Sequence, residues 1–326
     1  MNYDRVRVKG LARAAIRRGR PRPWTVTLVY TLLTTLPGAG LSYAASLSET
    51  LISGLASSPR EAAVLAALAA GGCGVLVGLL AAVLATGYTY YAMNLWRGRR
   101  ADFPDLFQGL ALAGRVVPLF LLTLALTVLW CLAGMALCLP ALAAGLLLRS
   151  QAALFLLLVL GAAGGLVLLL NRLLRYALAY HLLLDHPDWS AVSCLHASKR
   201  LMQGRRWSLV VLECSFLGWH LLRAVIALAA AAAVFGAAFQ LAVSMGWSHS
   251  HGAMWLVFLL AALAALALGS LCTLPLTLWL APYIHTAHAG FYDCAAGYGY
   301  PTAAPFQDAP AAPGTLPIPG LQTPEG

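Results

Sequence analysis

The sequence predicts an all-α protein: a polytopic membrane helix bundle of about six transmembrane helices, with two interfacial amphipathic helices and a basic N-terminal helix. Of the 326 residues, 61% are hydrophobic and 10% are charged, whereas soluble domains carry about a quarter charged residues. The mean hydropathy is +0.79, and several apolar runs exceed the roughly 20 residues that span a bilayer. The basic residues gather at the ends of these runs, where they orient a chain and meet lipid headgroups.

The chain divides into three parts by composition. Residues 1–23 form a basic arm, residues 24–296 a six-span membrane domain, and residues 297–326 a tail with seven Pro and no Lys or Arg. A segment of that composition has no apolar face to bury, so we expect the tail to be disordered.

The arm holds eight basic residues against one acid, Asp4. Helical spacing of its apolar residues predicts an amphipathic helix suited to an anionic membrane surface, ended by Pro21 and Pro23. The apolar residues are Val8, Leu11, Ala12, Ala15 and Ile16. A signal peptide is the alternative, with the arm as its basic region and cleavage near "SYAAS". The interrupted apolar stretch and the absence of a following soluble domain favour a first span.

The apolar runs place six spans along the chain, with a polar loop expected at 45–61 and a poorly marked boundary at 139–150. The spans are predicted at 24–44, 62–92, 116–138, 151–171, 207–232 and 255–281.

Two segments between spans read as interfacial helices, because each combines a capping residue with an apolar stripe at helical spacing. In residues 102–114 the capping residue is Asp102, Pro104 is in the first turn, and the apolar stripe consists of Phe103, Leu106, Phe107 and Leu110. In residues 188–203 the capping residue is Asp188, and the apolar stripe consists of Trp189, Val192, Leu195 and Met202.

Charge asymmetry predicts the orientation. With the N-terminus inside, 18 of the 21 Lys and Arg residues fall on one side: eight in the arm, four after the second span and six after the fourth. Cytoplasmic loops carry such an excess, so both termini are predicted to be cytoplasmic. The candidate contacts to lipid headgroups are Arg97, Arg99, Arg100, Lys199, Arg200, Arg205 and Arg206, and the candidate interfacial aromatics are Trp96, Trp207, Tyr283 and Tyr292.

Three ionisable residues lie deep in the predicted fifth span. Glu213, His220 and Arg223 fall within about 80° of one another on a helix, so they form one polar stripe. Charges inside a membrane usually face the bundle interior and mark functional sites. The competing interpretation is structural: Glu213 stays at the interface, Arg223 snorkels outward and His220 bonds a neighbouring helix.

Three pieces of the chain resemble a bacterial multi-pass membrane family, catalogued as domain of unknown function 975. They are "NLWRGRRADFPDLFQGL", "DHPDWSAVSCLHASKRLMQGRRWSLVVLECSFLGW" and "APYIHTAHAGFYDC". With the N-terminal arm, the resemblance covers most of residues 1–295. It implies a multi-pass protein of the bacterial cell (inner) membrane and supplies no biochemical role. His220 and Arg223 depart from it, since apolar residues are expected there.

No cofactor and no metal are predicted. His285 and His288 lie three residues apart near Asp293 and Cys294, but a third and fourth ligand at recognised spacing is missing. The sequence shows no GxSxG, HExxH, P-loop or dinucleotide motif, so we expect no enzyme. The basic residues form no stripe with stacking aromatics, so nucleic acid is not an expected partner.

Two function classes remain. The first is a non-catalytic membrane component that contacts anionic lipids or an envelope protein through its cytoplasmic surface helices. The second is a small-molecule transporter or exporter that uses the polar stripe of the fifth span.

Overall fold

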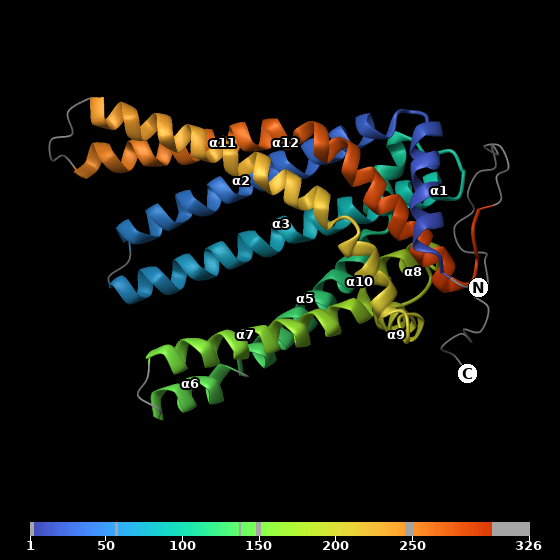
Figure 1. The fold of residues 1–326 in the computed structure, drawn as a ribbon, viewed down its shortest axis with the longest axis horizontal. Coiled ribbons are helices and arrows are strands. Elements are labelled where there is room, and N and C mark those ends of the chain that lie inside the picture. The colour runs from blue at the N-terminus through green and yellow to red at the C-terminus, as the bar shows by residue number, and fades with distance from the viewer. Residues whose placement is uncertain (1–2, 56–57, 137, 148–150, 245–250, 302–326) are drawn as a thin grey trace.

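The computed structural model describes residues 3–55, 58–136, 138–147, 151–244 and 251–301, and this part of the chain is helical, without strands. The long helices run along one axis and pair as hairpins (Figure 1). The pairs are α2 (Pro23–Leu55) with α3 (Pro59–Trp96), α5 (Ala113–Ala136) and α6 (Cys138–Leu147) with α7 (Gln151–Leu173), and α11 (Leu217–Ser244) with α12 (His251–Ala296). The predicted all-α bundle is confirmed.

Five helical segments of the described residues are long and apolar enough to cross a membrane. They are Arg60–Trp96, Ala113–Ala144, Leu154–Asp185, Leu217–Ser244 and Leu260–Ala296. Each overlaps a predicted span, and together they make this a multi-pass membrane protein.

The predicted first span corresponds to α2, which is not among those five although it has 33 residues. Threonines lower its hydropathy, but their hydroxyls bond within the helix. The hydroxyl of Thr27 donates to the Pro23 carbonyl at 2.8 Å, and that of Thr31 donates to the Thr27 carbonyl at 2.8 Å. Because such internal bonds reduce the cost of placing a hydroxyl in lipid, a sixth crossing by α2 remains our prediction.

The expected break after the first span is wrong. α2 continues through Pro37 and through most of the predicted polar loop 45–61, and α3 begins at Pro59. A proline removes one hydrogen bond, while the flanking turns of a long helix keep theirs. The helix that contains the predicted sixth span continues past residue 281 to Ala296.

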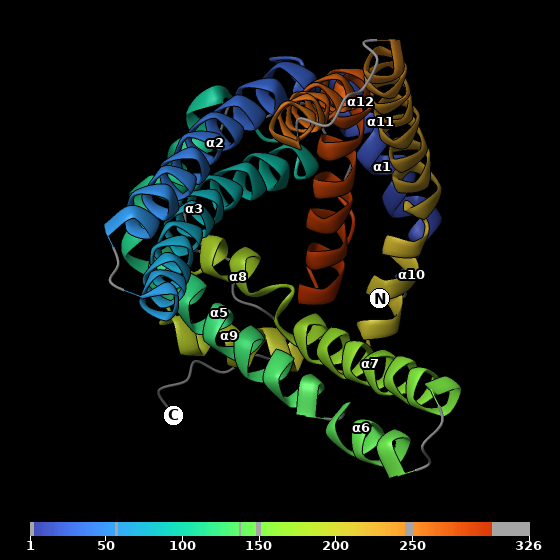
Figure 2. The same cartoon turned by 90° about the vertical axis from the view of Figure 1, so that its left-hand side faces the viewer.

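Apart from α6, the shorter helices gather at one end of the bundle, together with the end of α12 (Figure 1). We call this the α1 end. Its elements are α1 (Arg5–Arg18), η1 (Phe103–Phe107), α4 (Gln108–Ala111), η2 (Leu174–Tyr176), α8 (Ala179–Asp185), α9 (Ala191–Leu201) and α10 (Arg206–Cys214). Figure 2 shows the hairpins spread around the long axis.

The buried core also lies at the α1 end. Its largest cluster joins α1, α3, α8 to α10 and α12 around buried aromatic side chains, including Trp96, Phe216, Tyr283, Phe291 and Tyr292. Along the rest of the long helices, large apolar side chains such as Leu76, Leu166 and Val225 are exposed on the protein surface. A lipid bilayer is the solvent that such surfaces require.

Two helices predicted to lie on the membrane surface instead bury their apolar faces against protein. In α1, Val8 and Ala12 are fully buried against the core cluster. In α9, Leu195 and the C-cap residue Met202 are buried, while Val192 of the predicted stripe is 54% exposed. The N-cap is Ser190 rather than Asp188, since the Ser190 hydroxyl accepts from the Ser193 N–H at 3.2 Å. An amphipathic stripe has the same sequence pattern whether protein or lipid covers it.

The helix predicted for residues 102–114 is divided into η1 and α4 before α5 begins. Leu106 is buried against α3, while Phe103, Phe107 and Leu110 are exposed. The two elements lie close to α3 because of glycines: a Cβ on Gly109 would overlap the carbonyl oxygen of Val83. Only a residue without a side chain permits this approach.

The predicted fifth span is broken. α10 ends at Cys214, and α11 begins at Leu217. At the break, the Ser215 hydroxyl donates to the Leu212 carbonyl at 2.6 Å and accepts from the Lys9 ammonium group at 3.1 Å. A side chain that competes for backbone groups in this way ends the regular helix.

Candidate functional site

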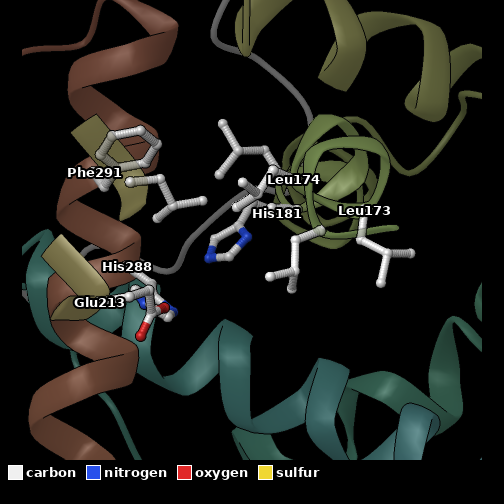
Figure 3. A pocket seen from close by; sticks show the side chains of 10 residues that line it. Leu173, Leu174, His181, Glu213, His288 and Phe291 are labelled. Atoms are coloured by element: carbon white, nitrogen blue, oxygen red, sulfur yellow. The ribbon is translucent and has the colours of Figure 1, made fainter. Parts of the chain in front are cut away.

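The candidate site lies inside the bundle near the α1 end, where two cavities meet. The first, of about 280 Å³, is lined mainly by apolar residues of α7, η2 and α10 together with His181, Glu213 and His288. Figure 3 shows the His181 ring between Leu174 and the pair formed by Glu213 and His288. We call it the His181 cavity.

The second cavity, of about 530 Å³, is richer in hydroxyl groups, and we call it the threonine cavity. It shares His181 and His288 with the first cavity, and its polar lining also includes Tyr30, Thr86, Thr89, Thr123, Thr127, Tyr180 and His285. Several of these hydroxyls donate to carbonyls in their own helices. Their oxygen lone pairs remain available as acceptors.

Different elements bring the imidazole rings together. His181 comes from the short helix α8, while His285 and His288 lie one turn apart on α12. The His288 Nε2 atom lies 2.5 Å from the Glu213 Oε1 atom, which is at the end of α10. The His181 ring of α8 stacks on Tyr292 of α12 at 5.2 Å between centroids.

One ring nitrogen at this junction lacks a partner. The Nδ1 atom of His181 is buried and makes no hydrogen bond within the described part of the chain, and the residue is only 8% exposed. An unpaired buried polar atom costs about 1–3 kcal/mol. The junction can therefore hydrogen-bond a small polar group.

A buried charge network lies beside these cavities. The Arg97 guanidinium donates to both oxygens of Asp185, at 2.7 and 2.8 Å, and to both oxygens of Asp293, at 2.6 and 3.1 Å. The Tyr292 hydroxyl donates to Asp185 at 2.9 Å. Burial lowers the pKa of Arg97, but the two carboxylates raise it further, so the pKa lies above its ordinary value.

This network corrects the prediction that Arg97 contacts lipid headgroups. Its side chain is 11% exposed, and its donors are engaged by carboxylates from α8 and α12. Three of the candidate interfacial aromatics, Trp96, Tyr283 and Tyr292, are likewise buried in the core, whereas Trp207 is 75% exposed. Hydropathy cannot separate an aromatic in an interfacial belt from one in a protein core.

The remaining candidate headgroup contacts lie on the surface of the α1 end. Lys199 and Arg200 are exposed, and Arg100 is 76% exposed beside Asp102. Arg99 is half-buried. Two of the cations also bond to protein: Arg205 donates to the Ala295 carbonyl at 2.5 Å, and Arg206 donates to the Asn171 side chain at 2.9 Å.

The break at Ser215 interrupts the predicted polar stripe, so that Glu213 lies on α10 while His220 and Arg223 lie on α11. Glu213 pairs with His288 and still interacts electrostatically with His220. Arg223 is exposed on α11. The angular argument assumed one continuous helix, which the structure does not have.

Sequence reasoning missed His181 and Asp185. Both lie in a segment treated as a loop, although the spacing of four residues is a helical signal. His285 and His288 were considered together, but their proximity to Glu213 depends on the fold. In the described residues, no group of three or more His, Cys, Asp or Glu side chains is arranged to hold a metal ion.

Comparison with known proteins agrees with the resemblance seen in the sequence. No curated protein and no solved structure matches the chain. A family model described as "Protein of unknown function (DUF975)" matches residues 1–296, which is the arm and the whole helical bundle. The chain therefore belongs to the DUF975 family.

Proposed function

We propose that this membrane protein is a non-catalytic component of the bacterial cell membrane, with both termini cytoplasmic, and that its α1 end binds anionic lipid headgroups. The observation that carries the proposal is the gathering of the three basic segments at that end. The arm, residues 97–115 and residues 172–206 hold 18 of the 21 Lys and Arg residues, and all three segments lie there (Figure 1).

Exposure supports lipid as the partner. Apart from the buried Arg97, many of these cations are exposed, including Arg5, Arg18, Arg20, Lys199 and Arg200. Each basic group near an anionic surface contributes about 1 kcal/mol of attraction. The large side chains of Trp207, Phe103, Phe107 and Leu110 are exposed at the same end, and groups of this kind insert at the headgroup level. An envelope protein that docks on this end is the other partner class we consider.

Lipid selectivity tests the proposal. In vesicles reconstituted with the full chain, spin-labelled phosphatidylglycerol should be immobilised at the protein surface more than spin-labelled phosphatidylcholine. Substituting Arg99, Arg100, Lys199 and Arg200 by Gln should reduce that preference, because four surface charges are removed. Arg60→Gln removes an exposed cation from the opposite end and should leave the preference unchanged. Equal immobilisation of both lipids by the unaltered protein would refute the proposal.

The cavities favour a second candidate, a small-molecule transporter or exporter. Ligand sites in helical bundles are mostly apolar with a few convergent polar groups, as in the two cavities at His181 and His288. A water-soluble thiol reagent should label His181→Cys in a background without native cysteines. Leu182→Cys, at a fully buried neighbour, should stay unlabelled. Protection of both positions would remove the support for transport.

A further inference from the structure

A third cavity, of about 540 Å³, lies between the α1–α2 corner and α12. Its polar wall carries Arg17 and Arg22, and its apolar wall includes Trp24, Pro275, Leu278 and Trp279. No Asp or Glu is among its lining residues. We call it the arginine groove.

The position of Arg17 follows from a row of cations on α1. Lys9, Arg13 and Arg17 are four residues apart, so they lie along one face of the helix. The first two contact protein: Lys9 bonds Ser215 at 3.1 Å, and Arg13 lies 5.2 Å from the centre of the Tyr283 ring. Arg17, the third, is exposed at the groove. Within the described residues no acceptor bonds its guanidinium.

Arg22 reaches the groove from the start of α2. Its backbone carbonyl accepts from the Thr25 hydroxyl at 2.7 Å, which holds the corner in place, while its side chain is exposed. Two guanidinium groups therefore line one groove without a carboxylate to neutralise them. Guanidinium forks match phosphate oxygens in geometry and charge.

The apolar wall of the groove is formed largely by one face of α12, beside the two arginines. Pro275, Leu278, Trp279 and Pro282 are spaced i, i+3, i+4 and i+7 on α12, so they form one stripe. Towards the middle of the bundle, α12 also exposes Leu271 (66%) and Leu268 (39%). Trp24 and Trp279 are 46% and 42% exposed, as amphipathic rings at a membrane interface are.

We propose that the arginine groove binds one phospholipid with an anionic headgroup, its phosphate between Arg17 and Arg22 and an acyl chain along α12. This inference rests on the proposed lipid-binding function and narrows it from a charged surface to one saturable site. A free phosphate would use the arginines alone, whereas a lipid also uses the apolar stripe of α12.

Native mass spectrometry of the full-length protein with added phosphatidylglycerol, phosphatidylcholine or glycerol phosphate tests the site. We expect one phosphatidylglycerol per chain to be retained preferentially, and the double variant Arg17→Gln/Arg22→Gln to bind it about tenfold more weakly, as the loss of about 1.4 kcal/mol requires. The matched control Arg18→Gln/Arg20→Gln removes the same charge from exposed residues of the same surface that do not line the groove. It should weaken retention of phosphatidylglycerol much less than the groove variant does.

A second variant keeps the charges. Leu278→Trp fills the apolar wall and should also weaken retention of phosphatidylglycerol, with thermal unfolding measured to show that the bundle is intact. The proposed lipid site would be contradicted if the control pair lost as much phosphatidylglycerol binding as the Arg17/Arg22 variant, or if both groove variants bound it normally. Equally tight binding of glycerol phosphate would also contradict it. The spin-label preference for anionic lipid would survive those outcomes, so failure of the site is distinct from failure of the proposed function.

Discussion

Arg97 illustrates how burial changes the contribution of a single charged residue to the stability of the fold. Its guanidinium joins α3 to α8 and α12 through Asp185 and Asp293, whose side chains are 12% and 6% exposed. Charges removed from water need such partners, because an unpaired ion in a low-dielectric interior is costly. Arg100, three residues further on, carries the same charge but remains in solvent beside Asp102.

We therefore expect Arg97→Gln to lower the free energy of unfolding by about 3–5 kcal/mol, because two carboxylates lose their buried partner. Arg100→Gln should change it by less than about 1 kcal/mol, as is usual for exposed ion pairs. Chemical unfolding of the detergent-solubilised protein measures both. Adding Asp293→Asn to Arg97→Gln should cost less than the sum of the two changes. Similar losses for the Arg97 and Arg100 variants would contradict this account.

At the scale of elements, the features that can be predicted are those that depend on residues close together in the sequence. The bounds of α3 and α7 lie close to the predicted second and fourth spans, because an apolar run of sufficient length becomes a helix in lipid. The break between α10 and α11 and the close crossing of α4 over α3 depend on residues distant in sequence. Lys9 contacts Ser215, and Gly109 contacts Val83.

The crossing of α4 and α3 gives a prediction with an internal control. Gly109→Ala should lower the free energy of unfolding by about 1–3 kcal/mol, because its Cβ would overlap the Val83 carbonyl and force the helices apart. Gly114→Ala adds the same methyl group at the start of α5, where nothing lies within 4 Å. That change should be neutral or stabilising, since Ala is the better helix former. Equal effects in a thermal unfolding series would rule out the close-contact explanation.

At the scale of the whole molecule, the charge distribution and the core coincide. The basic segments and the buried aromatic cluster both lie at the α1 end, while large apolar side chains remain exposed along the hairpins. This division suits a protein whose folded core meets one membrane interface and whose hairpins are covered by lipid.

Labelling can test the predicted orientation. With six crossings and cytoplasmic termini, single cysteines at Ser57 and Ser248 should react with an impermeant reagent added outside the cell, because the positive-inside bias puts the basic segments on the other side. A cysteine in the tail should react only after the membrane is opened. External labelling of the tail would contradict the topology, and so would protection of Ser248.

The candidate site shows where sequence reasoning stops. Glu213 and His288 were each noted as candidates, but their pairing joins residues 75 positions apart in sequence. The partners of Arg97 lie 88 and 196 residues away. Charge and hydropathy patterns identify an ionisable residue near a membrane, and they carry no information about which distant element supplies its partner.

The sequence by itself determined the membrane class, the helical content, the basic arm and the collection of cations that the fold places at one end. These follow from apolar run length and charge position, which are local properties of a chain. The tertiary structure alone decided that α1 and α9 bury their apolar faces in protein, that the fifth span breaks at Ser215, and that Arg97 lies inside. The physical reason is that an apolar face or a charge is stabilised by whatever covers it, and only the packing of distant helices decides whether that is lipid, water or protein.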